Sequence, residues 1–326
     1  MKPIKLYFAA AWAGGGKGEV NLIKAGIKNK LVSYVYPTQL TGWVENLPED
    51  QEGDVMVDSG AFSVWNKGSV IDLDAYIEYA HTAIDSMSKF PNQKVHIVNL
   101  DVIPGVAGQT HSLNKNFSKK EHSEVIEIAA KQGFENMKQM ISSGIKPIHV
   151  FHQGEKWAWL DRMLAHVDYI GISPANDLDT NARNSWMRTV FEYLEKNNAK
   201  VRTHGFAVTN RETLLHLPWT SCDAASWRLS AGMGNIYYPQ GGFANADYAR
   251  PVMVYSVSAT KTAEGVKHLT SYLLRILKED GYTLEDLQDW KTRTRVNIRY
   301  FLELEKWLNK EKAKYKCVRA TTLGIG

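Results

Sequence analysis

Short apolar runs that end in polar or small residues recur along the chain and predict β-strands. The stretches between them carry apolar residues every three or four positions, as amphipathic helices do. The two clearest helical patterns cover residues 72–90 and 118–141, where Asp72 and Ser118 are suited to be N-caps. The runs that predict strands are 5–10, 31–36, 54–58, 95–101, 146–152, 168–173, 201–207 and 221–225. Such alternation predicts either an open doubly wound sheet or a closed parallel barrel, and eight strands favour a (β/α)8 TIM barrel.

The chain changes character after the eighth predicted strand. Residues 231–251 are rich in Gly, Asn and Tyr and predict a long loop at the barrel mouth. Residues 261–278 predict the helix that closes the barrel, with one apolar face that comprises Val266, Leu269, Leu273, Ile276 and Leu277. We therefore expect a barrel domain over 1–280 and a C-terminal helical extension over 281–326.

The extension carries an apolar stripe and a cluster of basic residues. The stripe comprises Trp290, Ile298, Phe301, Leu302 and Leu308, and the cluster comprises Lys291, Arg293, Arg295 and Arg299. A solvated charged face on a packing helix is the simpler interpretation of the cluster. Contact with nucleic-acid phosphates is the alternative.

Composition adds little beyond the class of protein. The 326 residues are 44% hydrophobic and 23% charged, and the formal charge of +4 does not by itself indicate a polyanionic partner. Cys222 and Cys317 match neither a disulfide framework nor a zinc-binding spacing, which fits a reducing cytoplasm. We find no apolar run long enough for a signal peptide or a membrane span, so we expect a soluble cytoplasmic protein without a membrane partner.

Three aspartates stand at the ends of predicted strands. They are Asp58, Asp101 and Asp223. An aspartate in such a place is often only a cap or a turn residue. A carboxylate in an apolar strand is costly unless it is paired, hydrogen-bonded or used, and the carboxyl ends of barrel strands meet at one mouth. The residues expected to converge there are Asp58, Asp101, Gln153, Ser173, Gly205 and Asp223.

The order of several motifs resembles the tRNA-guanine transglycosylase superfamily. The motifs are DSGAFSVW at 58–65, the strand-end Asp101, HQG at 152–154, a strand with Gly171, HGFAV at 204–208 and CDAASWR at 222–228. The similarity covers roughly residues 50–230 and is strongest to the phage and bacterial branch that puts 7-deazaguanine bases into DNA. It implies a cytoplasmic enzyme, in the host cytoplasm if a phage encodes it.

The resemblance also implies roles for individual residues. Asp223 matches the nucleophile and Asp58 the general acid/base. Phe62 matches the aromatic residue that stacks on the base. The residues expected to bind the base are Ser59, Phe62, Asp101, Gln153, Gly171 and Gly205. Arg228 resembles an arginine that follows the nucleophile, and contacts with the nucleic-acid backbone are expected from Arg228, Lys17, Arg293 and Arg295.

Two departures from the family pattern bear on the substrate. The tRNA enzymes carry a zinc site of three cysteines and a histidine after the last strand, and no such set stands there in this sequence. The family's Gly-Gly pair is reduced to Gly171 followed by Ile172. The resemblance therefore implies a barrel without a zinc subdomain, with DNA as the partner and tRNA as the alternative.

The expected reaction replaces guanine in DNA with a free 7-deazaguanine base of the preQ0 or preQ1 type. A carboxylate nucleophile can hold the sugar carbon while one base leaves and another enters, as in retaining glycosidases. The exchange needs no cofactor and no metal. Crowding three carboxylates should raise the pKa of at least one of them.

Other interpretations remain open. The same exchange on tRNA, a catalytically idle barrel that binds nucleic acid, and a more distant glycoside hydrolase all compete with it. AGGGKGE at 13–19 lacks the hydroxyl residue of a phosphate-binding Walker loop, so Lys17 is expected at most to touch a backbone phosphate. His149 and His152 stand three apart in a strand and make a poor metal pair.

Overall fold

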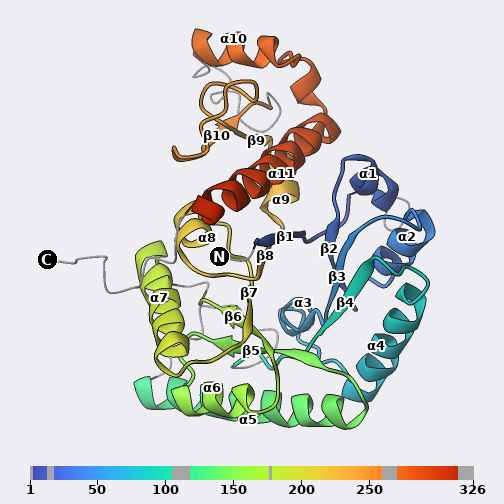
Figure 1. Cartoon of the computed structure of the whole chain (residues 1–326), viewed down its shortest axis with the longest axis vertical. Helices are drawn as coiled ribbons and strands as arrows, with labels where there is room; N and C mark the ends of the chain where they lie inside the picture. Colours follow the sequence, from blue (N-terminus) through green and yellow to red (C-terminus); the bar gives the residue numbers. More distant parts are fainter. Residues whose placement is uncertain (1–2, 13–17, 105–117, 176–177, 259–269, 315–326) are drawn as a thin grey trace, which may run out of the picture.

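The computed structural model describes residues 3–12, 18–104, 118–175, 178–258 and 270–314. Within them, eight parallel strands form a closed barrel in chain order, with the first strand paired to the eighth (Figure 1). The strands are β1 (Lys5–Phe8), β2 (Asn29–Ser33), β3 (Gly53–Asp58), β4 (Gln93–Val98), β5 (Pro147–His152), β6 (Tyr169–Ser173), β7 (Arg202–Gly205) and β8 (Ser221–Ala224). The predicted TIM barrel is confirmed.

The second and fourth strands are the ones whose predicted bounds differ most from the structure, and the second shows why. It begins at Asn29 rather than at residue 31, because the polar residues at its start are buried. The Lys30 ammonium lies inside the protein and donates hydrogen bonds to the carbonyls of Phe8, Ala10 and Leu31. Apolar patterning misses a strand that begins with such a satisfied polar residue.

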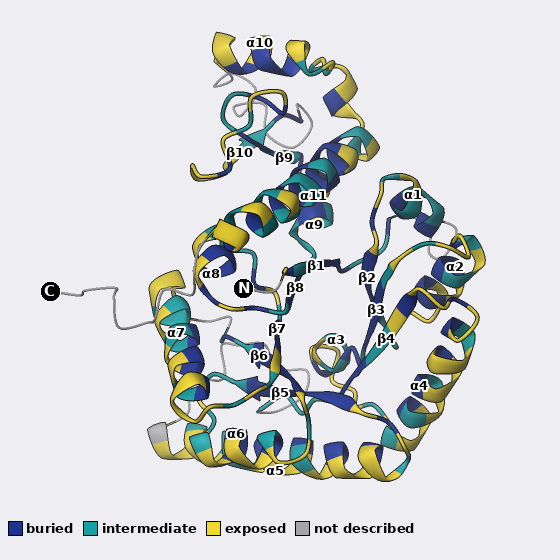
Figure 2. Ribbon diagram, viewed as in Figure 1, coloured by how far each residue is buried: buried dark blue, intermediate teal, exposed yellow. Residues whose placement is uncertain are grey.

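Helices alternate with the strands, and all of them except the short α3, which lies at the barrel mouth, cover the outside of the barrel (Figure 1). They are α1 (Glu19–Lys24), α2 (Thr38–Asn46), α3 (Ala61–Trp65), α4 (Leu73–Met87), α5 (Lys119–Ser142), α6 (Trp157–Leu164), α7 (Thr180–Lys196) and α8 (Arg211–His216). Figure 2 shows their exposed residues on the outer faces and buried residues toward the strands. Both predicted N-caps are confirmed: Asp72 accepts from Ala75 N–H, and Ser118 forms a capping box with Glu121.

Alternation along β3 separates two layers of the core. Val55 and Val57 belong to the large cluster shared with the surrounding helices, whereas Met56 belongs to a smaller cluster with Tyr7 and Tyr169. Side chains alternate along a strand, so Asp54 and Asp58 lie on the same side of β3 as Met56. The side that carries the smaller cluster is the barrel interior.

The chain beyond β8 does not follow the predicted loop and closing helix. Its elements are α9 (Ser226–Gly232), β9 (Asn235–Tyr238), β10 (Met253–Ser256), α10 (Ser271–Glu279), the 3-10 helix η4 (Asp286–Gln288) and α11 (Trp290–Lys314). Part of the predicted 231–251 loop is instead β9, which pairs antiparallel with β10. β9 is only four residues long and lies between Gly-rich segments, so its sequence does not predict a strand.

The predicted helix over 261–278 and its apolar face are confirmed only over the second half of that range. Residues 261–269, with Val266 and Leu269, lie outside the described residues, and α10 begins at Ser271. Its buried residues are Leu273, Ile276 and Leu277. The Tyr238 hydroxyl of β9 contacts the Ile276 carbonyl and Asp280 just beyond α10, so the helix end lies beside this sheet. In Figure 1 this part lies at the top, apart from the ring of barrel helices.

The last helix, α11, closes the seam between β1 and β8. Asn309 accepts the Ile4 N–H and donates to the Ile4 carbonyl, and Glu305 accepts the Leu6 N–H. Lys312 is buried and donates to the Leu217 carbonyl. The predicted apolar stripe is confirmed at Ile298, Phe301 and Leu308, which are buried, while Trp290 and Leu302 are partly buried. Of the helices described, none is both long and apolar enough to span a membrane.

Candidate functional site

A cavity of about 470 Å³ opens at the carboxyl ends of the barrel strands. The three predicted aspartates line it together, one from the end of β3, one just beyond β4 and one from β8. The polar residues in its wall include Asp58, Ser59, Asp101, His152, Gln153, Ser173 and Asp223. The strand-end rule therefore brings together every residue that it named except Gly205.

A tight turn after β3 holds the Asp58 carboxyl. Gly60 has a left-handed backbone (φ +73°), and a Cβ there would lie 2.4 Å from a Val35 methyl and 2.6 Å from the Ser33 hydroxyl. Only glycine fits both constraints. The Gly60 N–H donates to Asp58 Oδ2 at 2.9 Å. The DSG sequence thus folds the backbone around its own carboxylate.

The pKa of the Asp58 carboxyl lies near neutral pH. Burial raises its pKa most, and the nearby negative charges of Asp223 and Asp101 raise it further, against the hydrogen bond from Gly60. The resulting pKa is about 7, compared with 3.8 for an ordinary aspartate. Such a group can both give and take a proton at neutral pH.

Asp223 is held by one of its two oxygens. Its Oδ1 accepts a hydrogen bond of 2.8 Å from the Ala207 N–H and lies 3.4 Å from His204 Nε2. Cys222, its neighbour on β8, is fully buried on the other side of the strand, as alternation predicts, and burial raises the pKa of its thiol. A buried carboxylate with a fixed orientation is suited to nucleophilic attack.

Asp101 is paired with His152, a histidine for which no role in the site was predicted. His152 Nε2 lies 2.9 Å from Asp101 Oδ2, and His152 Nδ1 lies 2.9 Å from Glu155 Oε1. Burial alone would raise the pKa of Asp101, but the charge and hydrogen bond of His152 outweigh it and lower that pKa. The two carboxylates likewise outweigh burial and raise the pKa of His152 well above its usual value. Asp101 and His152 therefore form a charged pair in the cavity wall.

Two phenylalanines supply apolar surface to the cavity. Phe62 lies on α3 and is 40% exposed, and Phe206 follows β7. A Cβ at Gly171 would lie 2.3 Å from the Phe206 ring, so this glycine makes room for that ring. Gly171 does not line the cavity, which does not support the predicted backbone contact with a base.

Gly205 likewise packs rather than lines the cavity. A Cβ there would lie 2.8 Å from the Cys222 sulfur. Ser59 and Gln153 do line it. The Gln153 Oε1 accepts from the Ala175 N–H, which leaves its amide N–H₂ group as the part able to serve a ligand.

The four predicted backbone contacts differ in their surroundings. Arg293 is buried, and its guanidinium donates to the carbonyls of Ala231, Leu287 and Gln288, so the prediction that it contacts nucleic acid is wrong. Arg228 stacks on Trp290 and donates to the Trp12 carbonyl. Arg295 is exposed, with its guanidinium 5.8 Å from the Trp12 ring. Lys17 lies outside the described residues.

The site residues for which no role was predicted lie on β5 or on and just beyond β7. His152 stands beside Gln153 in HQG, and His204, Phe206 and Ala207 stand in HGFAV. Both motifs were visible in the sequence. Their partners were not, because these partners belong to neighbouring strands far away in the chain.

The described residues hold no group of three or more His, Cys, Asp and Glu side chains able to bind a metal ion. No model of a known protein family matches the chain, and no curated protein is similar to it in sequence.

Proposed function

We propose that this protein exchanges guanine in DNA for a 7-deazaguanine base through a covalent bond between Asp223 and the sugar. The observation that carries the proposal is the pairing of two carboxyl groups in one cavity. Asp223 is anchored by a single oxygen, and Asp58 beside it has a pKa of about 7. One group is suited to attack, and the other to move a proton.

The reaction balances with these two groups alone. Asp223 attacks C1′ of the deoxyribose, the C1′–N9 bond breaks, and its electron pair goes to N9 of the leaving guanine. Protonated Asp58 supplies the proton that neutralises this base. The incoming base then gives its N9 proton to the Asp58 carboxylate and attacks C1′, and the C1′–oxygen bond to Asp223 breaks. Both carboxyl groups return to their starting states.

The cavity wall offers groups that fit a guanine-like ring. Asp101 is kept ionised by His152, so its oxygens can accept from N1–H and the exocyclic amine of the base. The Gln153 amide can donate to the ring carbonyl. Phe62 and Phe206 provide aromatic surface for the ring faces. A base in a duplex would have to be flipped out to enter.

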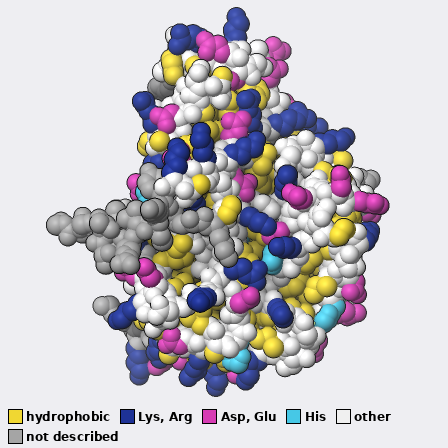
Figure 3. All heavy atoms as spheres, viewed as in Figure 1, with side chains coloured by type: hydrophobic (Ala, Val, Ile, Leu, Met, Phe, Trp, Pro, Cys, Tyr) yellow, Lys and Arg dark blue, Asp and Glu magenta, His cyan; other side chains and the backbone are white. Residues whose placement is uncertain are grey.

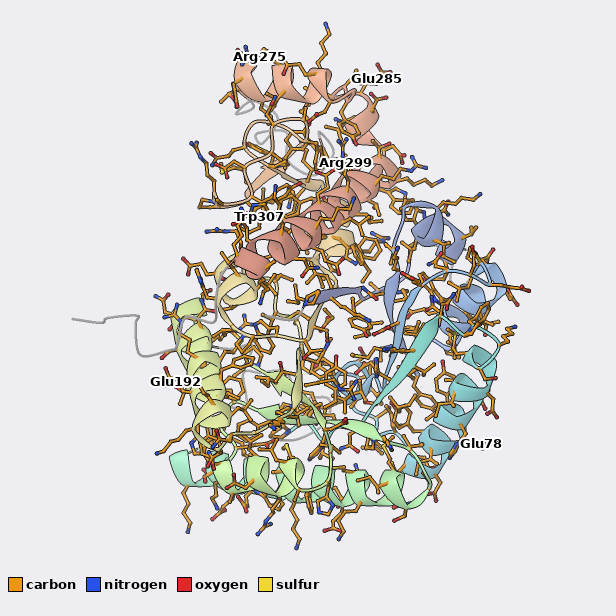
Figure 4. The ribbon with its side chains drawn as sticks, in the orientation of Figure 1. Glu78, Glu192, Arg275, Glu285, Arg299 and Trp307 are labelled. Atoms are coloured by element: carbon orange, nitrogen blue, oxygen red, sulfur yellow. The ribbon has the colours of Figure 1, made fainter. Side chains whose placement is uncertain are left out.

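A cationic face of α11 supports a polymeric, anionic substrate. At 3.6 residues per turn, five basic residues fall within about 100° of the helix circumference. They are Lys291, Arg295, Arg299, Lys306 and Lys310. Figure 3 shows Lys and Arg side chains along the junction between the top of the molecule and the barrel, and Figure 4 labels Arg299 on this helix.

A groove beside this face is lined by a further basic residue, Lys24. It has a volume of about 520 Å³ and lies between α1 and α11, with Lys24 in one wall and Arg295 and Lys306 in the other. Arg299 is paired there with Glu303 and covers the Phe243 ring. Phosphates of a DNA backbone fit such a groove, and their binding would weaken as salt increases.

The decisive experiment is incorporation of a labelled 7-deazaguanine into duplex DNA, single-stranded DNA and unmodified tRNA, with wild type and Asp223→Asn. We expect label in DNA with wild type only, and a protein–DNA adduct that survives denaturation. Label in tRNA alone would replace DNA with tRNA as the substrate. No label in any polymer would overturn the proposed exchange.

Binding of DNA in the groove between α1 and α11 can be tested with a matched pair of double substitutions. We expect Lys24→Glu with Lys306→Glu to weaken binding of a fluorescent duplex and to flatten its salt dependence. Lys94→Glu with Lys146→Glu changes two exposed lysines near the amino ends of β4 and β5 by the same charge. Equal effects from both pairs would reject the groove as the DNA contact.

A further inference from the structure

The two oxygens of Asp223 have different surroundings. Among the described residues, hydrogen bonds reach only Oδ1, from the Ala207 N–H at 2.8 Å, and His204 Nε2 lies 3.4 Å from that same oxygen. If Asp223 is the nucleophile, the two oxygens cannot be equivalent. Oδ2 is the one left to attack C1′, and Oδ1 becomes the carbonyl oxygen of the resulting ester.

The Ala207 backbone is specialised for this contact. Ala207 has φ +52°, in the left-handed region that residues with a Cβ rarely adopt. Strained backbone of this kind persists where the surroundings hold it, often at functional sites. Here it aims an N–H group at Oδ1.

His204 lies on the far side of Oδ1 from solvent, at the start of a buried chain of polar groups. Its side chain is fully buried, and Nδ1 lies 2.6 Å from the Ser221 hydroxyl. That hydroxyl lies 2.5 Å from the Tyr169 hydroxyl. Three adjacent strands, β6, β7 and β8, supply the three side chains. The rings of Tyr7 and Phe206 meet the His204 ring edge-on and fix its plane.

The number of protons on these three side chains decides which group donates in each hydrogen bond. Each hydroxyl has one proton to donate. If His204 carried its proton on Nδ1 only, a lone pair on Nε2 would face the Asp223 carboxylate. One of the two hydroxyl protons, on Ser221 or on Tyr169, would then lack an acceptor among the described residues. The opposite direction gives both hydroxyl protons an acceptor: Tyr169 donates to Ser221, and Ser221 donates to Nδ1. Nε2 is buried and forms no hydrogen bond among the described residues, and its proton faces Asp223 Oδ1 at an N–O distance of 3.4 Å.

We propose that His204 is a positioning residue whose Nε2–H, with the Ala207 N–H, holds Oδ1 of Asp223 and so selects Oδ2 as the attacking oxygen. The inference rests on the proposed transglycosylation. The distance of 3.4 Å is longer than an ideal hydrogen bond, and contacts of this kind often tighten only when the substrate is bound. In the second half of the reaction, donors at Oδ1 stabilise the charge that returns to the carboxylate as the C1′–Oδ2 bond breaks.

Two substitutions separate positioning from packing. In His204→Gln the amide N–H₂ reaches close to the place of Nε2, whereas in His204→Asn it reaches only the place of Nδ1. We expect His204→Asn to lower kcat by roughly 10- to 100-fold with little change in KM, as for loss of a hydrogen bond to a charged group, and His204→Gln to retain most of the activity. Equal losses in both variants, at equal stability, would show that His204 only packs.

A second measurement does not depend on activity. ¹⁵N NMR of the imidazole nitrogens, assigned with the His204 variants, reports which nitrogen carries the proton in the wild type. We expect a neutral Nε2–H tautomer whose signal shifts in Asp223→Ala. An Nδ1–H tautomer would overturn the proposal.

The two measurements also distinguish failure of the inference from failure of the proposed function. A wild type that incorporates no label would remove the exchange reaction, and the tautomer alone would then decide the role of His204. If the His204 variants do not fold, Tyr169→Phe leaves His204 in place and removes the first proton of the chain. Because Ser221 can then still donate to Nδ1, we expect the Nε2–H tautomer to be retained, and a change to the Nδ1–H form would count against the proposal.

Discussion

Asp54 and Asp58 stand four residues apart on β3, on the same face of the strand, and their surroundings move their pKa values in opposite directions. At the amino end, burial alone would raise the pKa of Asp54, but hydrogen bonds from His96 and Lys5 outweigh it and lower that pKa to about 2. At the carboxyl end, the pKa of Asp58 is about 7. The Tyr7 hydroxyl also donates to Asp54.

The difference separates two uses of a buried carboxylate. Asp54 has three side-chain partners on Oδ2, namely Lys5, Tyr7 and His96, and stabilises the amino end of the barrel. Asp58 is held by backbone N–H groups and has two neighbouring carboxylates, an arrangement that costs stability and prepares proton transfer. In TIM barrels chemistry belongs to the carboxyl end and stability to the amino end, and here one strand carries both.

The largest expected effect is on the rate of base exchange, which should depend on Asp58 at the carboxyl end of β3 and not on Asp54 at its amino end. Asp58→Asn keeps the shape of the side chain but cannot move a proton, so we expect base exchange to fall by roughly 10²- to 10⁴-fold. Asp54→Asn should leave the rate per folded molecule nearly unchanged. Single-turnover release of guanine from labelled DNA measures both. A large loss of rate in folded Asp54→Asn would erase the functional division between the two ends.

The second effect is on stability and has the opposite ranking. Asp54→Asn should lower the free energy of unfolding at pH 7 by about 2 kcal/mol, the value of a pKa shift from 3.8 to about 2. Because the folded pKa is depressed, this contribution is present above about pH 4 and is lost as the pH falls through about 2. Urea unfolding of Asp54→Asn and wild type at pH 7 and pH 3 measures it. An equal difference at both pH values would indicate that packing, not charge, is responsible.

The third effect is a dependence on pH of the stability of Asp58→Asn relative to wild type. The folded pKa of Asp58 is raised, so its favourable contribution is complete below about pH 4 and is lost as the pH rises through about 7. Asp58→Asn does not titrate. Its stability relative to wild type should therefore increase by roughly 2–4 kcal/mol from pH 4 to pH 7 and then level off. A difference that does not vary with pH would place the Asp58 pKa near its ordinary value.

The smallest effect concerns the shape of the carboxyl end. Gly171→Ala should push the Phe206 ring from its place, because the new Cβ would lie 2.3 Å from it. Loss of one stacking surface should raise KM for the incoming base roughly tenfold, with a smaller effect on kcat. Gly133→Ala on α5 is the matched control, since its Cβ would meet only ordinary contacts. An unchanged KM in Gly171→Ala would remove Phe206 from base binding.

The arrangement of strands and aspartates could be predicted because it follows from one rule. Parallel barrel strands end at one mouth, so Asp58, Asp101 and Asp223 had to approach each other once eight strands were recognised. Periodicity also located both capped helices and the apolar face of α11. These features depend on local sequence or on a symmetric architecture.

The remaining features depend on contacts between distant residues. The ionised state of Asp101 depends on His152, which lies on the next strand. The place of Phe206 depends on the missing side chain at Gly171. A charge pattern could not show that Arg293 is taken up by three backbone carbonyls, nor that β9 finds a partner strand fifteen residues further on.

The seam that α11 covers has a consequence for synthesis. β1 leaves the ribosome well before its outer partners, Glu305 and Asn309, because they follow Leu6 and Ile4 by 299 and 305 residues. Until then β1 lacks these hydrogen bonds, and its pairing with β8 also waits for most of the chain. A nascent chain would thus expose one unpaired barrel edge until these residues are made, and pairing over such sequence separations is slow and prone to aggregation. We expect truncation before residue 305 to yield aggregates rather than a smaller folded barrel.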